Sequence, residues 1–283
     1  MGKKRPEIKK IKYLGSLLEL KKVIKKKHVE KIIELSKTKS EKKLIDYCRE
    51  NQLDYSFIPE QMEMQTRNIE IDSINGIPII KLKPTPLDGW GRVIKRIFDL
   101  LSSLLLLIIL SPLMLIIAIL IKLDDPKANV LFKYLDDGSR VKRVGQKGLL
   151  FKFYKFRTMK PGTHNLRYTE LAKQNRRKDS PMVKIKNDPR ITKIGKFLRK
   201  TSLDELPQLF NVIKGEMSLV GPRPHLPEEV AKYQDHQRFV LTLKPGITGM
   251  AQVSGRSDLD FNQEVQLDTF YIENWSLWLD IKI

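Results

Sequence analysis

The spacing of hydrophobic and polar positions changes several times within the first 82 residues of the chain. Some segments repeat apolar residues every three or four positions, which predicts helices, and others are short apolar runs bounded by turn residues, which predict strands. The helices are expected at 17–26 and 40–51, and the strands at 31–35, 55–58, 69–71 and 77–82. Alternating helices and strands predict a small α/β unit in this part of the chain.

The most hydrophobic segment follows, about a third of the way along the chain. Leu100–Ile121 contains 22 residues without a charge, and no other stretch is comparable. As one unbroken helix this run would reach roughly 33 Å, which is enough to cross a bilayer. Ser111-Pro112 lies in its middle, and proline removes a backbone donor and clashes with the preceding turn. We therefore expect a helix–break–helix hairpin whose halves are each too short to span the membrane.

The charges beside this run favour the same shape. Basic residues tend to stay on the cytoplasmic side of a membrane, and they flank the run at both ends. They are Arg92, Lys95 and Arg96 before it, and Lys122, Lys127 and Lys133 after it. A re-entrant segment that enters and leaves through the cytoplasmic face satisfies both flanks. The alternatives are an ordinary spanning helix that tolerates the proline and a buried core helix of a soluble domain.

Prolines and glycines divide the chain around this hairpin. Pro84, Pro86, Gly89 and Gly91 predict a linker. We therefore expect four parts: an α/β module at 1–82, the linker at 83–91, the hairpin at 92–123 and a mixed α+β domain at 124–283.

The composition excludes several classes of protein. Lys and Arg number 53 and Asp and Glu 33, so the net charge is +20, which calls for a nucleic acid, an anionic membrane or a phosphorylated substrate as partner. Cys48 is the only cysteine, so an intrachain disulfide framework is excluded. The four histidines are scattered, and C-x-x-C and H-E-x-x-H motifs are absent, which argues against a zinc site of those kinds.

An acidic pair among basic residues is the strongest candidate for chemistry. Asp204 and Glu205 follow Arg199 within the segment RKTSLDELPQ. Ser202 and Glu205 have capping-box spacing, and Pro207 fits only near a helix start, so the pair should lie in a first helical turn. One carboxylate there can attack phosphorus and the other can hold a divalent metal, while Arg199 neutralises phosphate. The alternative is an N-capped surface helix whose acids complement its dipole.

Other motifs leave two interpretations open. Arg223 lies between two prolines, which suits either a preorganised anion contact or a rigid loop with a solvated arginine. Lys155 lies at the end of a predicted strand. Asp188 would cap the next helix or help to bind a metal. Trp275 and Trp278 would form an interfacial aromatic belt or belong to the core.

Several of these segments match one known pattern. The longest is Arg190–Pro224, which ends LRKTSLDELPQLFNVIKGEMSLVGPRP; shorter ones are Val93–Asp99, Ser111-Pro112, Lys155–Met159, Lys244–Arg256 and Asn274–Ile283. Over about residues 90–283 the chain resembles the bacterial sugar transferase family, the monotopic polyprenyl-phosphate phosphoglycosyl transferases. Residues 12–82 resemble the C-terminal half of the Rossmann-like regulatory domain of larger members. The N-terminal module would then be a truncated Rossmann-like α/β unit.

The resemblance implies an activity and roles for particular residues. The family transfers a sugar 1-phosphate from a nucleotide diphosphate sugar, here expected to be a UDP-sugar, to a polyprenyl phosphate and releases the nucleoside monophosphate. It implies Asp204 as the nucleophile that forms an aspartyl-phosphosugar, and Glu205 as the ligand of Mg²⁺; Asp188 is a second candidate ligand from its place in the sequence alone. It implies phosphate contacts for Lys155, Arg199, Arg223 and Arg256.

The resemblance also implies a location and partners. The enzyme would be monotopic at the cytoplasmic face of the bacterial inner membrane and would start a surface polysaccharide or glycoconjugate. Its partners would be the nucleotide sugar, the polyprenyl phosphate and membrane lipid, without nucleic acid, and a homodimer is left open. The chain departs from the family by an insertion at Asp136–Ser139, and spanning helices like those upstream in larger members are not expected. The alternative is a basic membrane scaffold that binds anionic lipid or nucleic acid without catalysis.

Overall fold

A computed structural model of the chain shows two compact units. It describes residues 19–27, 29–34, 41–57, 69–74, 77–82, 84–135, 138–167, 169–171, 185, 188–255 and 259–283. The first unit comprises Met1–Glu41 with Leu53–Lys83, and the second comprises Lys42–Gln52 with Pro84–Ile283.

The first unit is built on a mixed four-stranded sheet with the strand order β1-β2-β4-β3. Its elements are α1 (Leu20–Lys27), β1 (Lys31–Glu34), β2 (Asp54–Phe57), β3 (Ile69–Ile74) and β4 (Ile77–Leu82). β1 and β2 are parallel, whereas β4 runs antiparallel to both of its neighbours. The helices and strands of this region follow the predicted order, but most of α2 (Glu41–Glu50), which was expected within the same module, belongs to the second unit.

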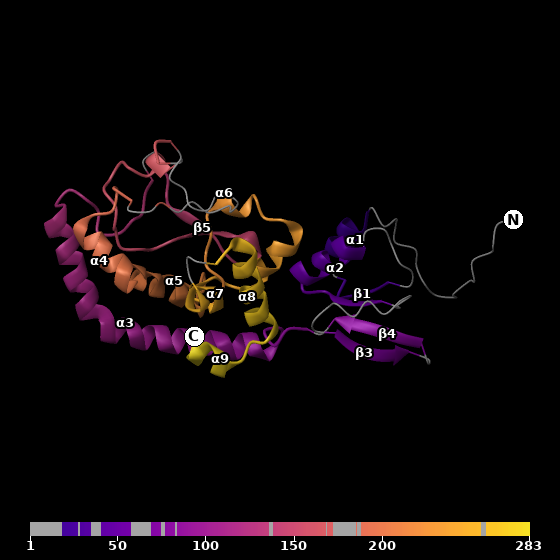
Figure 1. The fold of residues 1–283 in the computed structure, drawn as a ribbon. Coiled ribbons are helices and arrows are strands. Elements are labelled where there is room, and N and C mark those ends of the chain that lie inside the picture. The colour runs from indigo at the N-terminus through magenta and orange to yellow at the C-terminus, as the bar shows by residue number, and fades with distance from the viewer. Residues whose placement is uncertain are drawn as a thin grey trace. The chain divides into compact units, whose positions relative to one another are not determined.

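The apolar run belongs to one long helix, α3 (Trp90–Asp124), of 35 residues. The expected break at Ser111-Pro112 is absent, because helical structure continues through both residues. In Figure 1 the first part of α3 runs along the lower edge of its unit and the last part turns upward. The Ser111 hydroxyl donates a hydrogen bond of 2.9 Å to the carbonyl of Ile108. A proline bends a helix without ending it when the backbone groups that it frees find other partners.

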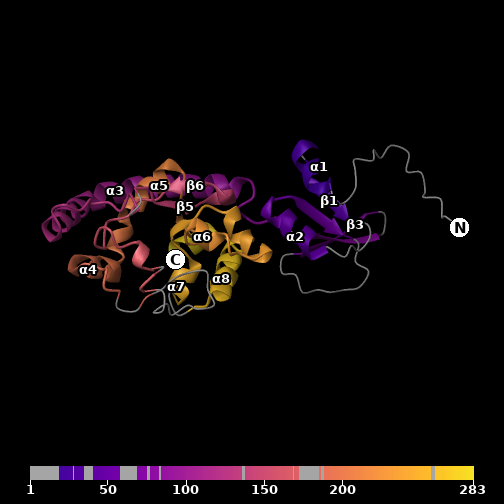
Figure 2. The same cartoon turned by 90° about the horizontal axis from the view of Figure 1, so that it is seen from above.

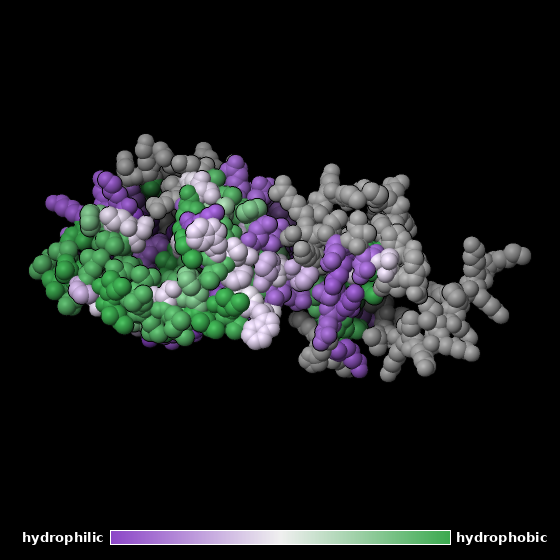
Figure 3. Space-filling model, turned by 90° about the horizontal axis from the view of Figure 1, so that it is seen from below, coloured by the Kyte–Doolittle hydropathy of each residue, from purple (hydrophilic) through white to green (hydrophobic). Residues whose placement is uncertain are grey.

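Most of α3 is exposed. Within the described part of the chain it is the one helix long and apolar enough to cross a membrane by length and composition. Leu101, Ile108 and Leu115 are 63%, 73% and 64% exposed, and Figure 3 shows a continuous hydrophobic surface where α3 is seen from below. Only 11% of the most apolar window is buried, which does not fit the alternative of a buried core helix.

The first half of α3 is held to its unit by charged side chains. Lys95 Nζ lies 2.7 Å from Asp280 Oδ2 and 3.8 Å from Asp99 Oδ1, and all three residues are buried. Arg96 donates hydrogen bonds of 2.6 and 2.8 Å to two carbonyls near the end of α5 (Leu209–Lys214). Two of the basic residues that flank the apolar run therefore bind groups of the protein itself.

The rest of the second unit combines short helices with two small sheets, as the prediction of a mixed α+β domain requires. β5 (Lys142–Val144) pairs antiparallel with β6 (Leu150–Lys152), and β7 (Ser218–Val220) pairs parallel with β8 (Gly246–Thr248). The other helices are α2 (Glu41–Glu50), α4 (Lys193–Thr201), α6 (Pro227–Val230), α7 (Met250–Ser254), α8 (Phe261–Glu273) and α9 (Leu277–Lys282), and the 3-10 turns are η2 (Gln146–Gly148), η3 (Asn165–Arg167), η5 (Leu203–Gln208) and η6 (Asp235–Thr242). Figure 2 shows α5 beside α3 and α7 beside α8.

The two C-terminal tryptophans have different environments. Trp275 is 8% exposed and donates a hydrogen bond of 3.2 Å from its ring nitrogen to Asp280. Trp278, on α9, is 63% exposed. Trp275 is therefore a core residue, whereas Trp278 is free to meet a membrane interface.

Candidate active site

The acidic pair lies in η5, directly after α4. Ser202, between the two elements, has a left-handed φ of 57° and makes no capping hydrogen bond with its side chain. The predicted capping box of Ser202 and Glu205 is therefore wrong, because a left-handed residue ends α4 instead of opening a helix. Asp204 and Glu205 nevertheless occupy the first turn of η5, as expected.

Lys155 lies between the two carboxylates. Its Nζ is 2.8 Å from Asp204 Oδ2 and 3.4 Å from Glu205 Oε1. The backbone sets this register, because the Phe156 N–H donates a hydrogen bond of 2.9 Å to the Asp204 carbonyl. Asp204 is only 2% exposed, and ion pairs away from water are weakly screened. Lys155, predicted as a phosphate contact, thus neutralises the acidic pair before any phosphate arrives.

The surroundings of Glu205 favour its ionised form. Burial alone would raise the pKa of Glu205, but the neighbouring cations Lys155 and Arg223 outweigh it. Hydrogen bonds from Lys155 and Gln208 act in the same direction, and the pKa lies below its usual range. Glu205 is therefore charged at neutral pH, which is the state in which a carboxylate binds a divalent cation.

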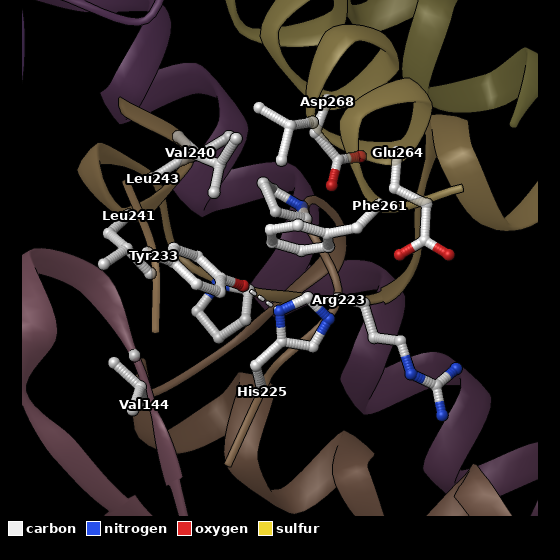
Figure 4. A pocket seen from close by; sticks show the side chains of 14 residues that line it. Val144, Arg223, His225, Tyr233, Val240, Leu241, Leu243, Phe261, Glu264 and Asp268 are labelled. Carbon is white, nitrogen blue, oxygen red and sulfur yellow. Dashed lines mark hydrogen bonds between the residues drawn. The ribbon is translucent and has the colours of Figure 1, made fainter. Parts of the chain in front are cut away.

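Two arginines reach the same place from different elements. Arg199, in the last turn of α4, donates from Nε to the Thr158 hydroxyl at 2.9 Å. Arg223 lies on the loop after β7, and in Figure 4 its guanidinium points away from the aromatic rings beside it. Among the described residues, neither arginine has a carboxylate within ion-pair distance. Both therefore have positive charge available for an anionic ligand.

Asp188 is engaged by a neighbour. Arg190 donates to its two carboxylate oxygens, from Nε at 2.8 Å and from Nη2 at 2.6 Å. The prediction that Asp188 caps the next helix is wrong, because Thr192 caps α4 by accepting a hydrogen bond from the Gly195 N–H. A metal at Asp188 would have to compete with this bidentate ion pair.

These groups line one cavity of about 710 Å³. The predicted site residues on its wall are Lys155, Asp188, Arg199, Asp204, Glu205 and Arg223. Arg256, and Asp136 and Asp137 of the insertion, lie outside the described residues. The cavity is also lined by Thr158, Arg190 and Asp268, which were not predicted. Thr158 and Arg190 lie within segments that resemble the family, and this resemblance was a signal that could have found them. No motif in the sequence pointed to Asp268.

The donor set of the site suits one kind of metal. In the described part of the chain no group of three or more His, Cys, Asp or Glu side chains is placed to hold an ion. Mg²⁺ needs fewer protein ligands, because it keeps several waters and binds one or two carboxylates together with substrate phosphates. Glu205 fits this requirement, since it is ionised and lines the cavity.

The environment of Asp268 predicts that stability depends on pH. Burial, reinforced by the nearby Glu264 (Figure 4), raises the pKa of Asp268 from 3.8 to about 7, although the Ala251 N–H favours its charged form. The folded state binds this proton more tightly than the unfolded state, so the free energy of unfolding should fall as pH rises from 3.8 to 7. Each pH unit within this range should lower the free energy of unfolding by about 1.4 kcal/mol at most.

Denaturant unfolding of the detergent-solubilised protein at several pH values measures this slope. Asp268→Asn should flatten it, and the exposed control Asp235→Asn should leave it as in the wild type. An equally steep slope in Asp268→Asn would assign the pH dependence to other groups.

The family model for bacterial sugar transferase matches residues 90–283. The chain therefore belongs to the bacterial sugar transferase family.

Three curated relatives illustrate the range of the similarity. The chain is 46% identical over 202 residues to the undecaprenyl-phosphate galactose phosphotransferase of Salmonella typhimurium, covering 68% of this chain and 39% of the relative. It is 39% identical over 235 residues to the UDP-glucose:undecaprenyl-phosphate glucose-1-phosphate transferase of Klebsiella pneumoniae, covering 80% and 46%. It is 40% identical over 201 residues to the exopolysaccharide production protein ExoY of Sinorhizobium fredii, covering 68% and 83%. The match thus spans less than half of the first two relatives.

Proposed function

We propose that the protein transfers a sugar 1-phosphate from a UDP-sugar to a polyprenyl phosphate and releases the nucleoside monophosphate, as the first step of a surface polysaccharide or glycoconjugate. The observation that carries this proposal is a single cavity, beside an exposed apolar helix, that holds Asp204, Glu205, Lys155 and two arginines. Two phosphorylated substrates need fixed cations, and a lipid acceptor needs a site at the membrane. The names of the Salmonella and Klebsiella relatives support a hexose donor and an undecaprenyl acceptor.

In the proposed reaction Asp204 is the nucleophile. One carboxylate oxygen attacks the phosphorus attached to the sugar, and the bond from this phosphorus to the nucleoside monophosphate breaks, with the electron pair leaving on the monophosphate. An oxygen of the polyprenyl phosphate then attacks the aspartyl-phosphosugar, which frees the carboxylate and forms a polyprenyl diphosphate sugar. Lys155 lies within ion-pair distance of both carboxylates and offsets their charge, and Arg199 and Arg223 stabilise the charge that grows on the phosphates.

We further propose Glu205 as the protein ligand of Mg²⁺. The ion, when bound, would neutralise phosphate charge and make the nucleoside monophosphate a better leaving group. Asp188 would join it only by giving up its ion pair with Arg190.

Helix α3 is proposed to be re-entrant and to hold the enzyme at the cytoplasmic face of the bacterial inner membrane. Its bend and the basic residues at both of its ends support this topology. Single cysteines in place of the exposed Arg92 and Lys127, in a chain with Cys48→Ala, should both react with a membrane-impermeant maleimide from the cytoplasmic side alone. Labelling of the two positions from opposite sides would show a spanning helix instead.

We propose the same division into domains that the sequence predicts. Residues 1–82 would be a partial Rossmann-like module, which the parallel pairing of β1 and β2 supports. A linker at 83–91 and the membrane segment at 92–123 would connect this module to the catalytic domain at 124–283.

An assay of UMP release tests the activity. The purified protein, with undecaprenyl phosphate and Mg²⁺, should release UMP from UDP-glucose or UDP-galactose, and omission of the lipid should stop turnover. A membrane scaffold would instead show salt-dependent binding to anionic vesicles and no UMP release from any nucleotide sugar.

A further inference from the structure

The bent helix α3 contacts two separate structures that carry cations of the catalytic cavity. Its first half contributes Asp99, which is 3% exposed and accepts two hydrogen bonds from β7. The Ser218 hydroxyl donates to Asp99 Oδ2 at 2.7 Å, and the Leu219 N–H donates to Oδ1 at 3.1 Å. These bonds fix the position of β7 along α3.

β7 leads directly into the loop that carries Arg223. The Gly221 N–H donates to the Thr248 carbonyl at 2.9 Å, and the Gly246 N–H donates to the Pro222 carbonyl at 2.8 Å. A Cβ atom on Gly221 would lie 2.5 Å from a backbone carbonyl oxygen, so the loop is packed tightly against its neighbour. Tightly packed backbone moves as a body, and a displacement of β7 would therefore displace Arg223.

The second half of α3 packs against residues next to the other cations of the cavity. Ile117, which is 2% exposed, belongs to one apolar cluster with Leu198 and Phe156. Leu198 directly precedes Arg199, and Phe156 directly follows Lys155. These cations therefore rest on the far half of the same helix.

Pro112 lies between these two contacts, within the bent helix (Figure 1). We propose that α3 sets the spacing between Arg223 and the wall that bears Arg199, and that Asp99 is the positioning residue that transmits this spacing to Arg223. The inference rests on the proposed function, in which both arginines bind one diphosphate.

The physical reason is the short range of the contacts that a diphosphate needs. Charge-assisted hydrogen bonds are strong only near about 2.7–2.9 Å, so a wall that moves by about 1 Å loses most of its contribution. A helical backbone, even one interrupted at a single proline, holds two distant contacts at a more constant separation than a loop does. The position of α3 against the rest of its unit thereby affects the affinity of the cavity for the diphosphate of the donor.

Binding of inorganic pyrophosphate to the purified full-length chain, measured by calorimetry in detergent, tests this coupling. Arg223→Ala is expected to weaken binding about tenfold and Asp99→Ala about fivefold. Because Asp99 acts through Arg223, the double variant should bind no more weakly than Arg223→Ala alone. Asp99→Ala combined with Arg199→Ala should instead multiply the two losses.

The other wall supplies the mirror experiment. Ile117→Ala should be non-additive with Arg199→Ala and multiplicative with Arg223→Ala. Gln237→Ala serves as a control for general destabilisation, since Gln237 is 5% exposed, bonds to Asn262 and does not line the cavity. It should lower the melting temperature and leave pyrophosphate affinity unchanged.

A conservative variant separates positioning from folding. In Asp99→Asn the amide oxygen still accepts from the Leu219 N–H. The amide nitrogen can donate to the Ser218 hydroxyl, whose own hydrogen has a second acceptor in the Val220 carbonyl at 2.8 Å. This variant should therefore recover the wild-type affinity for pyrophosphate.

The inference would be overturned if Asp99→Ala bound pyrophosphate with unchanged affinity, or if the wild type did not bind pyrophosphate. It would also be overturned if the loss of affinity in Asp99→Ala multiplied equally with the loss in Arg223→Ala and with the loss in Arg199→Ala. The assay of UMP release is read separately. If the variants show the expected non-additive losses in pyrophosphate binding but the wild type releases no UMP, the proposed function is rejected and the spacing role of α3 stands. If the wild type releases UMP but the variants show no such coupling, the spacing role is rejected and the proposed function stands.

Discussion

Replacement of Asp204 by Asn is expected to abolish UMP release, with a loss of at least about 1,000-fold in rate. The carboxamide has nearly the same shape as the carboxylate, but it carries no charge and is a poor nucleophile. Lys155, which lies 2.8 Å from the wild-type carboxylate, would face a neutral group, so the cavity would keep its form while the attacking group is lost. The measurement is the rate of UMP release in the presence of undecaprenyl phosphate.

Asp235→Asn is the matched control for this variant. Asp235 is exposed on η6 and does not line the cavity, so its replacement should leave the rate as in the wild type. Wild-type turnover in Asp204→Asn would reject Asp204 as the nucleophile.

The same variant separates two ways of using the carboxylate. If Asp204 attacks phosphorus, the wild type should release about one equivalent of UMP without any acceptor and retain the labelled phosphosugar, whereas Asp204→Asn should retain none. If Asp204 only accepts a proton in a single displacement, no UMP should appear until the polyprenyl phosphate is added. A burst without acceptor therefore identifies the covalent route.

Replacement of Lys155 by Met is expected to reduce the rate by about 100-fold. The ammonium group is the cation closest to both carboxylates, at 2.8 and 3.4 Å. Without it the two neighbouring carboxylates would repel each other, and the pKa of Glu205 would rise, because Lys155 is one of the cations that lower it. A protonated Glu205 cannot hold a metal, and an uncompensated pair of negative charges would repel the phosphates of the donor. Steady-state rates at saturating donor measure the loss.

Lys152→Met is the control, because Lys152 is an exposed lysine three residues earlier on β6. It should turn over like the wild type, and Lys155→Arg should recover part of the activity by restoring the positive charge. A Lys155→Met enzyme as fast as the Lys152 control would show that the pair does not depend on this cation.

Local features of the chain were predictable wherever neighbours in sequence decide the outcome. The uncharged run Leu100–Ile121 had to avoid water in some way, because its apolar surface is continuous along one helix. The helix-breaking tendency of Pro207 placed Asp204 and Glu205 in a first turn, and the structure confirms this position. The strands of the first unit were likewise readable from short apolar runs.

The errors fall where partners distant in sequence compete with local preferences. Ser202 has the composition of an N-cap but adopts a left-handed conformation, because α4 ends there and the chain must reverse. Asp188 is drawn away from capping by Arg190. Helix α3 continues through Pro112 without breaking, and its two halves pack on different parts of the unit.

The sequence alone therefore determined the membrane-seeking helix, the acidic pair and the basic residues suited to phosphate, since these depend on residue type and on short spacing. Only the tertiary structure decided that Lys155 lies between the carboxylates, that Arg199 and Arg223 share their cavity, and that Asp99 and Lys95 are buried. Such encounters join segments dozens of residues apart. They are selected by the free energy of burying charges in compensated pairs and apolar surface in a common core, which no local pattern encodes.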